Sequence, residues 1–176
     1  MQRRALSSRH SLWFIKRSEL QALSGKVFVR TAKVVLLVDD LESDLLLMKV
    51  AFGRAKVRHP IQEAVDGQQA IDYLSGAGVY ADRDRYPEVC VVITDLKMPK
   101  VDGFELLGWL RERSEFNRLP RVVLTASGLE EDRRRAAELG CCEYLVKPTG
   151  FERLIEVAEH LDDAWIEAHC PSAGKS

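Results

Sequence analysis

The stretch Val34-Val-Leu-Leu-Val-Asp-Asp40 is a short apolar run that ends in two acids. A run that is apolar at every position is typical of a strand covered on both faces, as strands are in a parallel sheet. Four more short runs are rich in apolar, mostly β-branched residues, so the predicted strands are residues 34–38, 61–65, 89–94, 121–125 and 143–146. Amphipathic segments with apolar residues at spacings of three and four follow these strands. The alternation predicts a three-layer α/β fold, with helices on both faces of a five-stranded, mostly parallel sheet.

Five helices are expected, one after each strand. The fourth and fifth are expected to begin at Ser127-Gly-Leu-Glu130 and Thr149-Gly-Phe-Glu152, because both sequences fit the capping-box pattern. The fifth is expected to continue without interruption to Trp165. Residues 75–88, which contain glycine, proline and charged residues, are expected to form a surface loop.

The composition is that of one globular domain, with 176 residues, 46% hydrophobic and 30% charged. The longest apolar runs are far shorter than the roughly 18 residues that a membrane-spanning helix needs, which excludes an integral membrane protein. The four cysteines show no CxxC spacing, so neither a zinc ribbon nor a disulfide framework is expected. We therefore expect a reduced, cytoplasmic protein.

Charge is distributed unevenly along the chain. Residues 1–33 carry eight Lys or Arg and one acid, a balance of +7, while the rest carries 18 bases and 26 acids, a balance of −8. An acidic body argues against a nucleic-acid-binding protein, since such surfaces are rich in Lys and Arg. We assign residues 1–32 to a basic extension, disordered or weakly helical, residues 33–168 to the domain and residues 169–176 to a tail.

The basic extension has an apolar segment at Leu12-Trp-Phe-Ile15. One interpretation is therefore an amphipathic helix at a membrane surface. The interpretations that we favour are a flexible tail or a start codon placed too far upstream.

Polar side chains follow four of the five predicted strands. They are Asp39 and Asp40, Asp95, Thr125 and Lys147. Ligands of open α/β sheets bind beyond the carboxyl ends of the strands, where these residues would meet. Three carboxylates at one place repel each other unless a cation lies among them, and oxygen ligands suit Mg²⁺. Lys147 would then bind a phosphate as a point charge, and Thr125 would donate a hydrogen bond to it. The combination predicts a carboxylate that accepts a phosphoryl group.

Each residue alone has a simpler interpretation. Asp40 would cap the helix that follows it, Thr125 would be an ordinary strand-end residue, and Lys147 an exposed turn lysine before Pro148. Their coincidence at matching strand ends favours the functional interpretation.

The same positions carry a family resemblance. The sequence resembles the receiver domain of bacterial two-component response regulators, the CheY-like family, over residues 33–168, in the strings Val34-Val-Leu-Leu-Val-Asp-Asp40, Val92-Ile-Thr-Asp-Leu-Lys-Met-Pro99, Asp102-Gly103, Val122-Val-Leu-Thr-Ala-Ser127 and Tyr144-Leu-Val-Lys-Pro148. The resemblance implies the flavodoxin-like strand order 2-1-3-4-5. It also implies that a sensor histidine kinase transfers a phosphoryl group from a phosphohistidine to Asp95.

The resemblance assigns further roles around Asp95. Asp39, Asp40, Asp95 and the backbone carbonyl of Lys97 would hold Mg²⁺. The protein would be a switch that catalyses only its own phosphorylation and dephosphorylation, and not an enzyme with another substrate.

The conformational switch would use three residues from the last two strand ends. Thr125 would move to bind the phosphoryl group, Tyr144 would rotate inward, and Lys147 would pair with the phosphate. The bond between Lys147 and Pro148 would be cis. The signal would leave through protein contacts to a downstream target that the sequence does not name. One such contact would be a homodimer through the fourth helix, fifth strand and fifth helix.

A narrower resemblance comes from three stretches. Tyr80-Ala-Asp-Arg83 with Tyr86-Pro87, Thr125-Ala-Ser-Gly-Leu-Glu-Glu-Asp132 and the terminal Ala164-Trp165 are similar to stand-alone regulators that partner phytochrome-type photoreceptor kinases. The alternative is an ordinary single-domain receiver with a different kinase.

Two positions depart from the commonest receiver pattern. Lys97 is two residues past Asp95, where a neutral residue is frequent, and Ser127 is two past Thr125. We expect Lys97 to contact the phosphoryl group and to change its lifetime. Lys97 also argues against an aspartyl-phosphate phosphatase of the haloacid dehalogenase type, which needs an acid at that position.

The sequence argues against two other functions. A receiver that never takes phosphate and only binds partners would be expected to have lost a key residue, and none is lost. The string Gly76-Ala-Gly-Val-Tyr-Ala81 fits a dinucleotide-binding pattern, but it follows a helix instead of a strand, so we reject that function.

Overall fold

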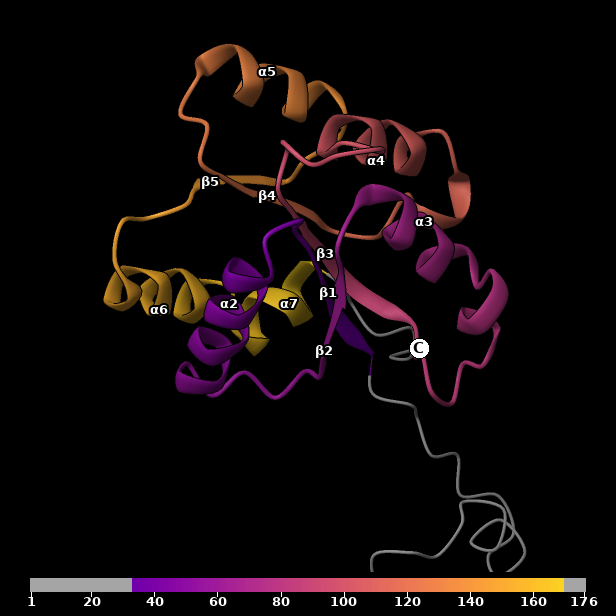
Figure 1. Ribbon diagram of the computed structural model, residues 1–176, viewed down its shortest axis with the longest axis horizontal. Coiled ribbons are helices and arrows are strands. Elements are labelled where there is room, and N and C mark those ends of the chain that lie inside the picture. The colour runs from indigo at the N-terminus through magenta and orange to yellow at the C-terminus, as the bar shows by residue number, and fades with distance from the viewer. Residues whose placement is uncertain (1–32, 170–176) are drawn as a thin grey trace, which may run out of the picture. The chain divides into compact units, whose positions relative to one another are not determined.

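A computed structural model of the protein describes residues 33–169. Its centre is a five-stranded parallel sheet of order β2-β1-β3-β4-β5 (Figure 1). The strands are β1 (Val34–Val38), β2 (Ile61–Ala64), β3 (Val89–Thr94), β4 (Arg121–Thr125) and β5 (Glu143–Val146). Four strands have the predicted bounds, and β2 ends one residue earlier than predicted. The strand order that the resemblance implied is confirmed.

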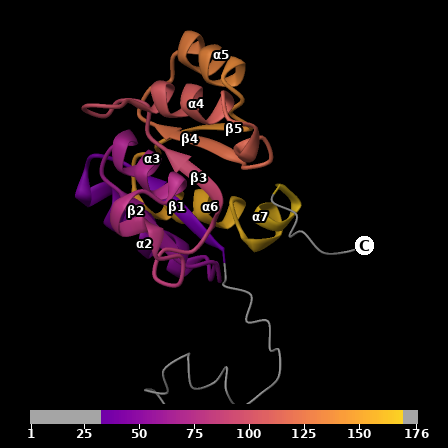
Figure 2. The same ribbon diagram turned by 90° about the vertical axis from the view of Figure 1, so that its right-hand side faces the viewer.

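Helices cover both faces of the sheet (Figures 1 and 2). The helices are α2 (Glu42–Arg54), α3 (Gly67–Ser75), α4 (Gly103–Arg111), α5 (Glu130–Glu138), α6 (Phe151–His160) and α7 (Asp163–His169). Two 3₁₀ turns, Gly78–Ala81 and Ser114–Phe116, lie in the loops. Helices α2, α6 and α7 pack on one face of the sheet, and α3, α4 and α5 pack on the other.

The apolar core lies on both sides of β1 and β3. All five residues of β1 are buried, as are five of the six in β3. On one face Met48 and Phe52 of α2 share a cluster with Ala158 of α6, and on the other Tyr73 of α3 shares one with Leu106 of α4. Burial on both faces explains why β1 is apolar at every position and why β3 is apolar up to Thr94. The three-layer α/β prediction is confirmed.

The predicted fifth helix is divided into two. Helix α6 ends at His160, and α7 begins after Asp162, whose side chain accepts a hydrogen bond from the amide of Trp165 at 2.8 Å. An acid in this position caps a new helix and competes with continuation of the old one. The prediction of one uninterrupted helix was wrong, because the apolar periodicity continues to Trp165 across the cap that Asp162 forms.

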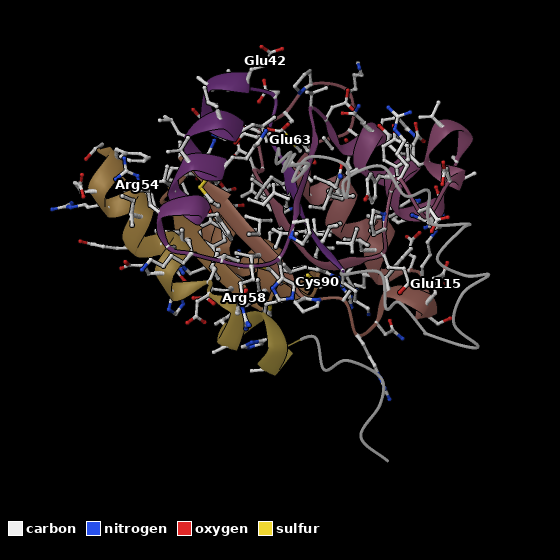
Figure 3. All side chains as sticks on the ribbon, turned by 90° about the horizontal axis from the view of Figure 1, so that it is seen from below. Glu42, Arg54, Arg58, Glu63, Cys90 and Glu115 are labelled. Atoms are coloured by element: carbon white, nitrogen blue, oxygen red, sulfur yellow. The ribbon has the colours of Figure 1, made fainter. Side chains whose placement is uncertain are left out.

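Helix α7 is fixed to the loop after α2. Asp163 Oδ2 lies 2.6 Å from Arg58 Nε, and its Oδ1 lies 2.8 Å from His59 Nδ1. In the view from below, Arg58 lies beside the two C-terminal helices (Figure 3).

Both predicted capping boxes were wrong. Helix α5 begins after Leu129 and α6 after Gly150, and neither residue gives a side-chain cap. Ser127 lies two residues before the N-cap residue Leu129, and its Oγ donates to Asp132 Oδ2 at 2.5 Å and accepts from the amide of Leu129 at 3.4 Å. The capping box that the structure has is at α4, where Asp102 and Glu105 bond to each other's backbone amides.

Residues 1–32 and 170–176 lie outside the described residues, and so do the predictions made for them. Over residues 33–169, no helix has the length and apolar character needed to cross a bilayer.

Candidate functional site

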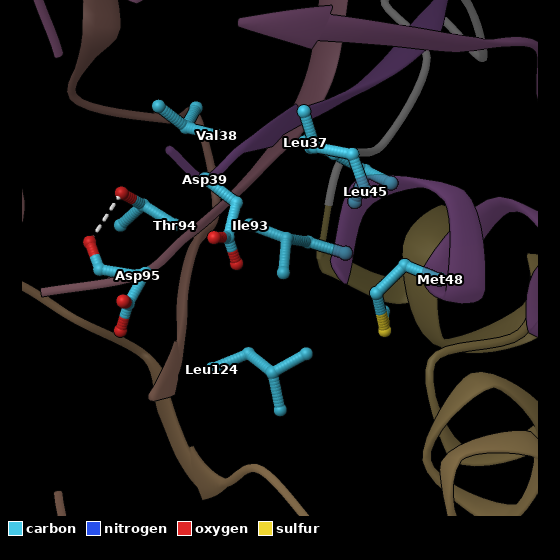
Figure 4. A pocket seen from close by; sticks show the side chains of 9 residues that line it. All are labelled: Leu37, Val38, Asp39, Leu45, Met48, Ile93, Thr94, Asp95 and Leu124. Atoms are coloured by element: carbon cyan, nitrogen blue, oxygen red, sulfur yellow. Dashed lines mark hydrogen bonds between the residues drawn. The ribbon is translucent and has the colours of Figure 1, made fainter. Parts of the chain in front are cut away.

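Three acids meet at the carboxyl edge of the sheet, as the sequence predicted. Carboxylate oxygens of Asp39, Asp40 and Asp95 lie within 4.8 Å of one another. Asp39 follows β1 and Asp95 follows the neighbouring strand β3, and the Asp95 amide donates to the Val38 carbonyl at 2.9 Å. The parallel pairing of β1 with β3 therefore places both acids at the same edge (Figure 4).

Backbone amides orient two of these carboxylates. Asp39 Oδ1 accepts from the amide of Leu41 at 3.1 Å, and Asp95 Oδ1 accepts from the amide of Leu96 at 2.7 Å. Both side chains are buried, with 7% of Asp39 and 9% of Asp95 exposed. Burial raises the pKa of Asp39, although hydrogen bonds from Lys147 and Leu41 oppose that rise. Burial of these ionised carboxylates therefore costs free energy, and a bound cation would reduce that cost.

Lys147 reaches the acids from the end of β5. Its Nζ lies 2.6 Å from Asp39 Oδ2, 2.7 Å from Asp44 Oδ2 and 3.8 Å from Asp95 Oδ2. Burial disfavours the charged amine, but the hydrogen bonds to Asp39 and Asp44 outweigh burial and raise the pKa of Lys147. The side chain is therefore a fixed ammonium at neutral pH.

Asp44 was not predicted as a site residue. It lies in the first turn of α2, the helix that directly follows Asp39 and Asp40, and its Oδ2 comes within 2.7 Å of Lys147 Nζ. An acid in the first turn of the helix that follows the acidic pair was the signal that could have found it.

The donor set fits a hard divalent cation. The three clustered acids, Asp39, Asp40 and Asp95, offer oxygen ligands, and Asp40 is half-buried at the opening of the site. The side chain of Lys97 is exposed. The metal-ligand role of its carbonyl oxygen stays a prediction.

The predicted switch residues Thr125 and Tyr144 are buried in the neighbouring strands β4 and β5. Thr125 is buried at the end of β4, where its carbonyl accepts from the amide of Lys147 at 2.7 Å and its Oγ1 accepts from the amide of Ser127 at 3.4 Å. The Tyr144 hydroxyl donates to the Ser127 carbonyl at 2.9 Å, and its ring is buried. The inward rotation of Tyr144 during the switch stays a prediction.

The predicted cis bond before Pro148 was wrong. No peptide bond over residues 33–169 is cis. The trans form has the lower energy even before proline. From a trans backbone, Lys147 still reaches Asp39 and Asp44.

A small, mostly apolar pocket adjoins the acids (Figure 4). It is lined by Leu37, Val38, Asp39, Leu45, Met48, Ile93, Thr94, Asp95 and Leu124. Its walls limit the access of water to the inner side of Asp39 and Asp95.

The comparisons with known proteins agree with this geometry. A model of the response regulator receiver domain matches residues 35–159. The probable methanogenesis regulatory protein FilR2 of Methanothrix harundinacea is 35% identical, over 76% of this chain and 83% of that protein.

Two relatives also have solved structures. Response regulator Rcp1 of Synechocystis is 30% identical over 77% of this chain and 90% of its own length. The crystal structure of its Mn²⁺-bound form gives a TM-score of 0.68, at 28% identity over 82% of this chain and 99% of that one. The bacteriophytochrome response regulator AtBRR gives a TM-score of 0.63, at 35% identity over 74% of this chain and 91% of that one.

The matched range, residues 35–159, includes Asp39, Asp40, Asp95, Thr125 and Lys147. The chain therefore belongs to the family of response regulator receiver domains of two-component systems, and it resembles the regulators associated with phytochromes.

Proposed function

We propose that this protein is a phosphoacceptor switch, in which Asp95 receives a phosphoryl group from a phosphohistidine of a sensor histidine kinase. The observation that carries the proposal is the setting of Asp95. One of its oxygens is fixed by the amide of Leu96, and the other faces the ammonium of Lys147 beside two more acids.

In the transfer, an oxygen of Asp95 forms the new bond to phosphorus while the bond from phosphorus to the histidine nitrogen breaks, and the imidazole leaves with the electron pair. Such transfers need mainly placement and neutralisation of charge. Asp39, Asp40 and Asp95 would hold Mg²⁺, which supplies charge neutralisation when bound. The Mn²⁺-bound structure of Rcp1 supports this choice of ion type. Lys147 holds the second positive charge.

The protein would act as a switch, not as an enzyme with a separate substrate. A Mg²⁺-dependent phosphatase would need an acid two residues past Asp95, and that residue is Lys97 with an exposed side chain. A pseudo-receiver that binds partners without phosphorylation is the outcome that the experiment below distinguishes.

The proposed partner is a sensor histidine kinase of the phytochrome type. Support comes from AtBRR, which is described as a bacteriophytochrome response regulator. The predicted homodimer would use α5, β5 and α6, the elements that the structure gives for that face. That dimer and the cytoplasmic location stay predictions.

The first test is intact-protein mass spectrometry after incubation with acetyl phosphate and Mg²⁺. We expect an adduct of about 80 Da on the wild type, and none on Asp95→Asn or in the presence of EDTA. An equal adduct on Asp95→Asn would place the phosphoryl group elsewhere. A folded wild type without an adduct would identify a pseudo-receiver.

The second test concerns the kinase. A phytochrome-type kinase labelled with [γ-³²P]ATP should transfer label to the wild type within minutes and not to Asp95→Asn. Equal transfer from an unrelated sensor kinase would contradict the assignment of a phytochrome-type partner.

A further inference from the structure

Three carboxylates surround the Lys147 ammonium, and Asp95 is the most distant of them. Its Nζ lies 2.6 Å from Asp39 and 2.7 Å from Asp44, but 3.8 Å from Asp95. The first two distances are those of charge-assisted hydrogen bonds, whereas the third is a longer ion pair. The ammonium therefore lies on the α2 side of the site.

Asp44 is well placed to hold this ammonium. Its position is fixed by α2, since its amide donates to the Leu41 carbonyl at 2.9 Å in the first turn of the helix. Its side chain is 27% exposed and that of Lys147 17%, so solvent screens their pairing only in part. Asp44 Oδ2 accepts a hydrogen bond from Lys147 Nζ, and Asp44 Oδ1 accepts one from Ser43 Oγ at 3.4 Å.

A bound cation would affect differently the two carboxylates that hold Lys147. Asp39 belongs to the acidic cluster that fits a divalent cation, and a cation there would compete with Lys147 for Asp39. Asp44 lies outside that cluster, so a cation bound there would not compete with Lys147 for it. With a cation bound, the choice for Lys147 is between Asp44 and a phosphoryl group on Asp95.

We propose that Asp44 is a positioning residue that acts on Lys147. It competes with phosphorylated Asp95 for the Lys147 ammonium and thereby shortens the lifetime of the phosphorylated state. This inference rests on the proposed function. Each time Lys147 pairs with Asp44, the phosphoryl oxygens lose a neutralising charge and the acyl phosphate is less protected. Removing the charge of Asp44 shifts Lys147 to the phosphoryl group, since an amide oxygen holds an ammonium less strongly than a carboxylate does.

The experiment measures the lifetime of the phosphorylated full chain. Wild type, Asp44→Asn and Glu42→Gln are phosphorylated with acetyl phosphate and Mg²⁺, the donor is removed, and loss of the adduct is followed by intact mass. Glu42 is the matched control, because it lies in the same first turn of α2 and is exposed. We expect Asp44→Asn to lengthen the half-life about three- to tenfold, and Glu42→Gln to leave it unchanged.

A double-mutant cycle tests whether the effect passes through Lys147. Asp44→Asn is combined with Lys147→Met, and the affinity of all four proteins for beryllofluoride, an analogue of the phosphoryl group, is measured by ¹⁹F NMR with Mg²⁺. This measurement needs no phosphorylation, so a slowly phosphorylated Lys147→Met does not prevent it. We expect Asp44→Asn to tighten binding about three- to tenfold when Lys147 is present and to have no effect when it is absent.

Two results would overturn the inference while leaving the proposed function intact. One is an Asp44→Asn half-life equal to that of Glu42→Gln. The other is an effect of Asp44→Asn that persists without Lys147, which would make it a general effect of charge. A wild type that takes neither the phosphoryl group nor beryllofluoride would instead overturn the proposed function, and this inference with it.

Discussion

Gly103 packs directly against the peptide of Asp95. A Cβ atom on Gly103 would lie 2.1 Å from the Asp95 carbonyl oxygen and 2.7 Å from the Leu96 Cα, both of them backbone atoms that cannot rotate away. The Gly103 amide also donates to the Leu96 carbonyl at 3.0 Å. The start of α4 is thus joined to the backbone that carries the proposed phosphoacceptor.

Gly103→Ala should therefore destabilise the protein by about 2 kcal/mol or more, because the added methyl group forces backbone atoms apart. Urea unfolding followed by circular dichroism measures the free energy of unfolding. The control is Gly108→Ala in the same helix, where a Cβ atom would meet nothing within 4 Å. That variant should be neutral or up to about 1 kcal/mol more stable. Equal effects at the two positions would contradict the close packing.

Lys97→Asn should shorten the half-life of phosphorylated Asp95 about threefold, because a neutral side chain two residues past Asp95 removes a charge that stabilises the phosphoryl oxygens. Loss of the adduct is followed by intact mass. Lys49→Gln on α2, a lysine that pairs with Glu63 at 3.2 Å, is the control for loss of one positive charge. An unchanged dephosphorylation rate in Lys97→Asn would rule out contact between Lys97 and the phosphoryl group.

Asp163 should make stability depend on pH. Burial opposes its ionisation, but hydrogen bonds from Arg58 and His59 outweigh burial and lower the pKa of Asp163 from 3.8 to about 2. A lowered folded-state pKa contributes stability that is present above the unfolded value and is lost as pH falls through the folded one. Asp163→Asn should cost about 1 to 2 kcal/mol at pH 7, allowing for the exposure of Arg58, and the difference from wild type should shrink between about pH 4 and pH 2.

Thermal unfolding across that pH range measures the effect. Glu159→Gln, an exposed acid on the neighbouring helix α6, should show no such change. A difference between wild type and Asp163→Asn that is constant with pH would show that the ionised carboxylate is not what stabilises α7.

Arg121 should be important for stability despite its charge. It is 5% exposed, and its two Nη atoms donate to the carbonyls of Leu110, Phe116 and Leu139 at 3.1 to 3.3 Å. These carbonyls end α4, the 3₁₀ turn after it and α5. Arg121→Met leaves all three without these bonds, and we expect a loss of about 2 to 4 kcal/mol. Arg118→Met, at an exposed position in the loop before β4, should stay within about 0.5 kcal/mol of wild type.

The sequence predicted the strands and the acidic site well, for one physical reason. Buried parallel strands are rich in apolar residues, so the ends of β1 and β3 are clearly marked, and the carboxyl ends of parallel strands meet at one edge. Asp39 and Asp95 are neighbours although they are far apart in the chain, because β1 pairs with β3. That pairing came from the family resemblance, which implied the strand order.

What the sequence missed depends on choices between competing hydrogen bonds. Ser127 matched a capping pattern but bonds to Asp132, while Asp102 makes the capping box with Glu105. Asp162 starts a new helix where periodicity alone predicted continuation. The pairing of Asp44 with Lys147 joins α2 to β5. The place of Asp44 after the acidic pair is a local signal, but Lys147 lies 103 residues further along the chain, so no local pattern identifies it as the partner.

The five strands differ in how firmly they hold the groups at their ends. Asp39 and Asp95 stand on β1 and β3, central strands that hydrogen-bond to neighbours on both sides, whereas Lys147 stands on the edge strand β5, which pairs only with β4. Edge strands open locally at lower cost than central ones, so backbone amides of β5 should exchange with deuterium faster than those of β1 and β3. The central strands thus hold the two acids in place, whereas Lys147 can be displaced without unfolding the sheet.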